Sequence, residues 1–170
     1  MPRASSTPRH PVRLVAHGFA PDQWRLLTSL PAEIMIATIA LQDDGPRRTV
    51  AEGLAGLDAI AAGRGSDSDL VRGVVAAIYA EPEDDRPAPI PDGDGPTARQ
   101  AAVLAECRRA AEILRAGVDP ADAAAYRHWV QQVAVRVFGA TRSGGVLGLD
   151  GETIGPAERE FLADLATALA

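Results

Sequence analysis

Apolar residues recur every three or four positions along most of the chain, a spacing typical of amphipathic helices. The alternation of apolar and polar residues that marks a half-buried strand is nearly absent, and the short, glycine-rich segment 145–154 is its only candidate. Proline, glycine and capping residues divide the helical pattern into six segments: 21–42, 49–62, 69–80, 97–116, 120–140 and 156–170. The pattern therefore predicts an all-α bundle of about six helices.

The first two segments carry more detailed predictions. Pro31 has no amide hydrogen, so we expect it to kink the first helix or to begin a new one. Thr49 and Glu52 have the spacing of a capping box, which predicts that the second helix begins at Thr49. That helix should bury the apolar positions of its repeat, which are Val50, Leu54, Leu57, Ile60 and Ala61.

Composition divides the chain into a tail and one folded unit. Residues 1–18 hold several prolines and little periodicity, which predicts a disordered basic tail. Residues 81–96 combine prolines with acids, a composition typical of a flexible linker. The two halves on either side, 19–80 and 97–170, each have too few amphipathic helices to close a core alone. We therefore expect residues 19–170 to form a single helical domain.

Charge and composition exclude several classes of protein. The net charge is −6, so the folded part should repel phosphate backbones, and we expect no nucleic-acid partner. No apolar run approaches the roughly 20 residues that span a bilayer, which predicts no transmembrane segment. The single cysteine, Cys107, excludes an internal disulfide and a cysteine-based zinc site. Because no early apolar run follows the basic start, we also expect a cytoplasmic protein without a secretory signal.

Two short segments share the order of their residues. In each of them an Asp-Gly pair precedes a helix, and a glutamate stands seven residues after the glycine. The first copy has Asp44, Gly45 and Glu52, and the second has Asp150, Gly151 and Glu158. Short helix–helix connections favour a glycine in the turn and an acid in the first helical turn, so these residues can be explained as helix caps.

The motif also resembles that of the TerB-like group of small helical proteins, named after tellurite-resistance operons. The second copy, 150–158, fits the motif well, whereas arginines occupy the middle positions of the first copy, 44–52. The resemblance implies two related helical halves, a link to stress and an acidic patch that can hold a metal ion. It places the metal ligands at Asp44, Glu52, Asp150 and Glu158. The glycine-rich segment 144–148, with the motif after it, is similar as well to small helical bacterial proteins without a known activity.

Other chemistry-bearing residues lack the neighbours that their chemistry needs. A calcium loop over 150–161 would have Ile154 and Pro156 where oxygen ligands belong. His128 has no nucleophile motif to serve, so we expect it to tie helices together at the edge of the core. Cys107 lies in the apolar row of its helix and should be buried, and nothing predicts a lowered pKa for its thiol. The sequence therefore predicts no catalytic residues.

The function that these observations favour is that of a non-enzymatic helical binding or adaptor module, with a role in stress if the family resemblance holds. Its partner would be another protein or a second copy of the chain, because an apolar helix face left exposed by one copy can pair with itself. The alternative is a metal-dependent or small-molecule-processing enzyme that uses the acids at the helix–helix turns. No cofactor is predicted beyond the divalent metal of that alternative.

Overall fold

The computed structural model describes residues 18–41, 46–80, 95–140 and 155–170. In these ranges the secondary structure consists of α2 (Pro21–Ile39), α3 (Pro46–Ala62), the 3₁₀ turn η1 (Gly63–Gly65), α4 (Asp69–Ala80), α5 (Pro96–Gly117), α6 (Pro120–Ala140) and α7 (Pro156–Ala168). The described residues contain no strand, and the prediction of an all-α bundle is confirmed. Residues 1–17 of the predicted tail, residues 81–94 of the predicted linker and the strand candidate 145–154 lie outside the described residues.

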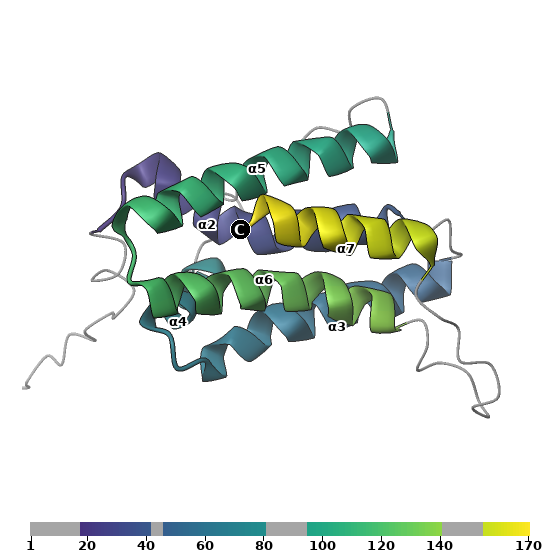
Figure 1. Cartoon of the computed structure of the whole chain (residues 1–170). Coiled ribbons are helices and arrows are strands. Elements are labelled where there is room, and N and C mark those ends of the chain that lie inside the picture. The colour runs from purple at the N-terminus through teal and green to yellow at the C-terminus, as the bar shows by residue number, and fades with distance from the viewer. Residues whose placement is uncertain (1–17, 42–45, 81–94, 141–154) are drawn as a thin grey trace, which may run out of the picture.

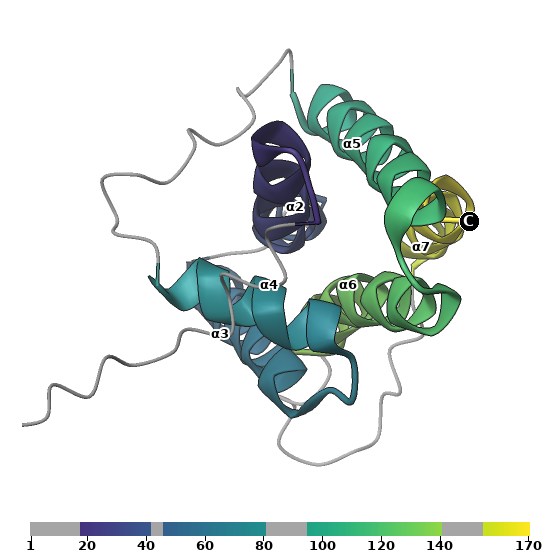
Figure 2. The ribbon, with the colours of Figure 1, turned by 90° about the vertical axis from the view of Figure 1, so that its left-hand side faces the viewer.

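The helices are arranged around α2 and α6 (Figure 1). α2 packs against α3, α4, α5 and α6, and α6 packs against all five other α-helices. Seen along the bundle, α5 and α7 lie on one side of this central pair, and α3 and α4 lie on the other (Figure 2). Because α2 to α4 come from the first half of the chain and α5 to α7 from the second, the two halves share one core.

The core is filled by the apolar side chains that the periodicity of α2, α4, α5, α6 and α7 predicts. Its fully buried members include Leu27, Ile34, Val71, Val75, Val103, Leu114, Val133 and Leu165. Phe138 of α6 meets Phe161 of α7 edge to face, with ring centroids 6.4 Å apart, which fixes the last helix to the centre of the bundle. Within the described ranges, no helix has the length and apolar character needed to cross a membrane.

Pro31 lies inside one continuous helix and does not begin a new one. A proline has no amide hydrogen for the carbonyl four residues earlier, which here belongs to Leu27. That carbonyl accepts a 2.8 Å hydrogen bond from the phenol of Tyr126 on α6 instead. A tertiary hydrogen bond thus replaces the missing helical one, and α2 continues to Ile39.

The start of α3 differs from the prediction. The helix begins at Pro46, three residues before Thr49, so Thr49 and Glu52 lie inside it and the predicted capping box is wrong. Proline suits the first helical position because its φ is already helical and its missing amide hydrogen would have no helical partner there. Glu52 therefore stands in the second turn of α3.

Two caps fix the starts of α4 and α6 to each other. The hydroxyl of Ser68 accepts a 3.3 Å hydrogen bond from the amide of Val71 and donates a 2.5 Å bond to the carboxylate of Asp122 in α6. Asp119 caps α6 by accepting a 2.9 Å hydrogen bond from the amide of Ala121. These bonds hold the two helix starts side by side.

Candidate functional site

The four acids of the predicted metal site do not all fall in the described part of the chain, because Asp44 and Asp150 lie outside it. Glu158 stands in the first turn of α7. Its carboxylate accepts a 3.0 Å hydrogen bond from the amide of Gly155, the residue before the helix. Glu158 therefore acts as a helix cap, as the capping interpretation of the motif predicts.

Glu52 has a different environment from Glu158. It lies on the inner side of α3 with 1% of its surface exposed, and a carboxylate at that depth requires a compensating partner. Glu52 does have an interaction partner. The helices that carry the two glutamates, α3 and α7, both begin at the same end of the bundle (Figure 1).

A metal centre is not assembled by the described residues alone. Among them, no three or more histidines, cysteines and acids form a group that could hold a metal ion. The four-acid site includes Asp44 and Asp150, so it stays a prediction.

α3 turns its largest apolar side chains outward. Val50 is 63% exposed, Leu54 59% and Leu57 50%. Their spacing of four and three residues places them on one face of the helix, and we call these three residues the α3 stripe. The prediction that they are buried is wrong, although Ile60, from the same predicted set, is buried.

Small residues on the inner face of α3 explain this orientation. A Cβ added at Gly56 would lie 2.5 Å from the side chain of Met35 on α2 and 3.1 Å from that of Val137 on α6. At Gly63, directly after α3, an added Cβ would lie 2.8 Å from the ring of Trp129. At these two positions α3 approaches its neighbours too closely for a leucine side chain, and Val50, Leu54 and Leu57 face outward.

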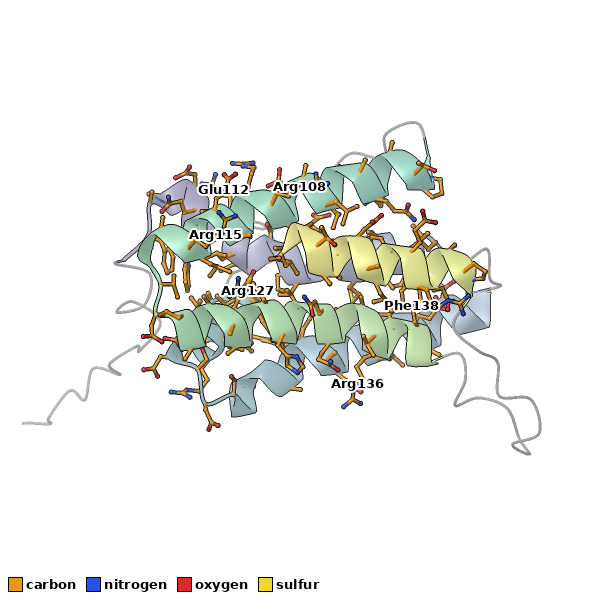
Figure 3. All side chains as sticks on the ribbon, in the orientation of Figure 1. Arg108, Glu112, Arg115, Arg127, Arg136 and Phe138 are labelled. Carbon is orange, nitrogen blue, oxygen red and sulfur yellow. The ribbon has the colours of Figure 1, made fainter. Side chains whose placement is uncertain are left out.

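An open groove of about 490 Å³ runs between α3 and α6, next to the α3 stripe. Its lining residues come from the end of α3, from η1 and its flank, and from one face of α6: Asp58, Ala59, Ala62, Gly63, Gly65, Ser66, Ala125, His128, Trp129, Gln132 and Arg136. Asp58 follows Leu57 directly and stands one turn after Leu54, so it borders both the groove and the stripe. Arg136 projects from α6 away from α5 and α7 (Figure 3).

His128 lies on the rim of this groove and is exposed, so the prediction that it ties helices together is wrong. Its neighbours in α6 make those ties. Tyr126 donates to the carbonyl of Leu27 in α2, and the indole of Trp129 donates a 3.2 Å hydrogen bond to the carbonyl of Ala59 in α3. The polar atom of Trp129 is therefore already used by the fold.

Two buried titratable groups keep their protons at neutral pH. Burial raises the pKa of the Cys107 thiol from 9.0 to about 12, and burial also raises the pKa of the Tyr126 phenol well above 10.0. A thiol must lose its proton to act as a nucleophile. Cys107 is thus a buried apolar residue, as its position in the sequence predicts.

The outward face of α5 contrasts with that of α3. Arg108, Glu112 and Arg115 lie along it and are exposed (Figure 3). The large apolar side chains that are exposed among the described residues belong to α3, α4 and α6, and none belongs to α5. The bundle therefore has a charged face over α5 and an apolar one over α3, on opposite sides (Figure 2).

The chain matches no protein-family model, no curated protein and no solved structure. The geometry of the described residues is therefore the basis on which a function can be argued.

Proposed function

We propose that the chain is a non-enzymatic binding module that recognises a protein partner through the α3 stripe and the rim of the adjoining groove. The observation that carries the proposal is the α3 stripe itself. Val50, Leu54 and Leu57 each keep half or more of their surface exposed on one helix face. Contiguous exposed apolar side chains rimmed by polar ones mark interaction surfaces.

The surroundings of the stripe support a protein partner. Interfaces between proteins combine an apolar centre with a polar, solvent-accessible rim. Here the stripe provides the apolar centre, and Asp58, His128 and Arg136 provide polar and charged groups beside it. A role in stress rests on the resemblance of the 150–158 motif to the TerB-like group and forms a separate part of the proposal.

Site-specific photo-cross-linking in living cells tests this function. A photoreactive residue at position 57, in the full chain, should give a discrete cross-linked product. The matched control carries the same residue at position 112, in the charged face of α5, and should give none. The absence of a product from position 57, or equal products from both positions, would contradict a binding role of the α3 stripe.

A pair of polar substitutions separates binding from folding. Leu54→Gln together with Leu57→Gln should change the free energy of unfolding by about 0.5 kcal/mol or less each, because both side chains are exposed. The same pair should abolish cross-linking from position 50. A large loss of stability would instead show that the stripe is covered within one copy of the chain.

A further inference from the structure

We propose that the groove between α3 and α6 binds an acidic α-helix of the protein partner, with the carboxylates of that helix facing the α6 wall. This inference rests on the proposed function and adds the chemistry of the partner segment and the place where it lies. Its first support is a row of polar side chains on α6. His128, Gln132 and Arg136 line the groove at four-residue spacing, so they lie on adjacent turns of one helix side.

The side chains of this row are open to a ligand. His128 and Arg136 are exposed, and Gln132 is half-buried. Within the described ranges, the three side chains form no hydrogen bond or ion pair with one another or with Asp58 on the α3 wall. Glutamine and arginine offer N–H donors, and arginine can bind both oxygens of one carboxylate. The row is therefore complementary to acidic side chains.

The α3 wall decides which side of a bound helix carries the acids. The lining residues of the groove include one acid, Asp58, and it belongs to this wall. A carboxylate beside Asp58 is repelled, whereas a carboxylate beside Arg136 is attracted. The acids of the partner helix therefore face α6, and the side that faces α3 carries neutral or basic residues.

The walls of the groove favour a helical segment over an extended one. Both long walls are helices, whose backbone groups are already paired along their length, so an added strand would find no row of free amides and carbonyls. His128 and Arg136 are eight residues apart, which is about 12 Å or two turns. A helix that runs alongside can match this row with two or three acids at the same four-residue spacing.

The groove is already formed in the chain without a partner. Its buried lining residues are Ala59, Gly63 and Trp129. The indole of Trp129 donates a 3.2 Å hydrogen bond to the carbonyl of Ala59, which ties α6 to α3 beneath the groove. Because the two walls are held in place before binding, little ordering of this chain opposes association.

Photo-cross-linking from within the groove identifies the partner segment. The full chain carries a photoreactive residue in place of Ala62, which is exposed and lines the groove. Mass spectrometry of the product then gives the sequence of the cross-linked segment. We expect a helical sequence with two or three acids spaced by three or four residues. A segment without acids overturns the inference.

Charge changes on the two walls test the direction of recognition. A labelled synthetic peptide of the cross-linked segment is titrated with the full chain and followed by fluorescence anisotropy. Arg136→Glu should weaken binding about fivefold or more, and Asp58→Asn should strengthen it about twofold. Unchanged affinities, or changes of the opposite sign, overturn the inference.

The matched control makes the same charge change outside the groove. Arg108→Glu, on the exposed face of α5, should leave binding unchanged. Because Arg136 is exposed, Arg136→Glu should unfold at the same urea concentration as the wild type. A peptide with arginines in place of its acids should bind the Arg136→Glu chain more tightly than the wild type, since opposite charges then meet again. Failure of this reversal contradicts contact between the acids and α6.

The two cross-linking positions keep this inference distinct from the proposed function. Products from both position 57 and position 62 support the binding role and place the partner in the groove. A product from position 57 without one from position 62 overturns the helix in the groove and leaves the binding role of the α3 stripe in place. No product from either position contradicts both.

Discussion

The carbonyl of Leu27 connects a local irregularity of α2 to the packing of α6. Pro31 deprives this carbonyl of its helical donor, and the phenol of Tyr126 provides another at 2.8 Å. Burial raises the pKa of that phenol well above 10.0, so it keeps its proton and remains a donor at neutral pH. Since Leu27 and Tyr126 are both fully buried, the loss of the phenol would leave a carbonyl without a partner in the core.

Tyr126→Phe should therefore lower the free energy of unfolding by about 1–3 kcal/mol. The loss should be smaller in a Pro31→Ala background, because the backbone amide that alanine provides at this position can then donate to the Leu27 carbonyl. Urea unfolding of the wild type, both single variants and the double variant measures this coupling. Strictly additive losses would show that the two residues do not serve the same carbonyl.

Cys107 makes stability depend on pH on the alkaline side. Folding raises the pKa of its thiol from 9.0 to about 12 through burial. Above pH 9 the unfolded chain releases this proton while the folded chain retains it, so the contribution is fully present below pH 9 and is lost as the pH rises toward about 12. The stability of Cys107→Ala relative to wild type should therefore increase from pH 8 to pH 10, as measured by denaturant unfolding at both values. A constant difference between the two proteins would contradict this.

At the scale of the element, small residues let α3 pack closely at several positions of its inner face. Its inner face contains Gly56 and Ala59 and is followed by Gly63, whereas Gly53 has no atom within 4 Å of an added Cβ. Glycine thus has two roles, within α3 and directly after it. At positions 56 and 63 it permits close packing, and at position 53 it only adds flexibility to the unfolded chain.

Replacing these glycines with alanine should have opposite effects. Gly63→Ala should lower the free energy of unfolding by about 1–3 kcal/mol, because the added methyl group meets the ring of Trp129 and the side chain of Val75. Gly53→Ala should raise it by about 0.5–1 kcal/mol, since alanine is the better helix former. Thermal and urea unfolding of both variants measure the two changes. The same sign at both positions would argue against close packing as the reason for Gly63.

At the scale of the whole molecule, the main contacts join the first half of the chain to the second. α3 packs on α6, and α2 packs on both α5 and α6. The two groups of helices are connected through residues 81–94 and also through the shared core. Integrity of the bundle should therefore not depend on the covalent connection.

A protease site inserted within residues 81–94 tests this. After cleavage the two fragments should elute together in native buffer and separate only in denaturant, because the core contacts between α2, α5 and α6 persist. The uncleaved protein with the same insertion is the control. Two fragments that separate in native buffer and remain helical would show that each half folds alone.

Periodicity predicts the inner faces of α5, α6 and α7 because large apolar residues occupy these faces, whereas charged or small residues occupy the opposite ones. The same criterion selects the wrong face of α3. Whether Leu54 is buried depends on how closely α3 approaches its neighbours, and that distance is determined by the contacts of Gly56 and Gly63 with other helices. A single helix does not contain this information in its own pattern.

The candidate site shows the same division between local and distant causes. The capping role of Glu158 depends on Gly155, only three residues away in the sequence, and the motif predicts it. The groove needs α3 and α6 side by side, so it has no signal in either segment alone. The exposure of His128 has a distant cause as well. Tyr126 and Trp129 bond to α2 and α3, and these contacts set the rotation of α6 that leaves His128 at the surface.

The position of Trp129 gives the bundle an optical reporter. Trp129 is 7% exposed, and its indole donates a hydrogen bond to the carbonyl of Ala59 in α3. Its ring lies so close to Gly63 that a side chain at that position would meet it. The sequence holds two tryptophans, so Trp24→Phe leaves Trp129 as the single strong fluorophore. Its emission should lie at short wavelength and move to longer wavelength when α3 separates from α6 and water reaches the ring. If that shift precedes the loss of helical circular dichroism during a urea titration, α3 can leave the bundle while the other helices stay folded.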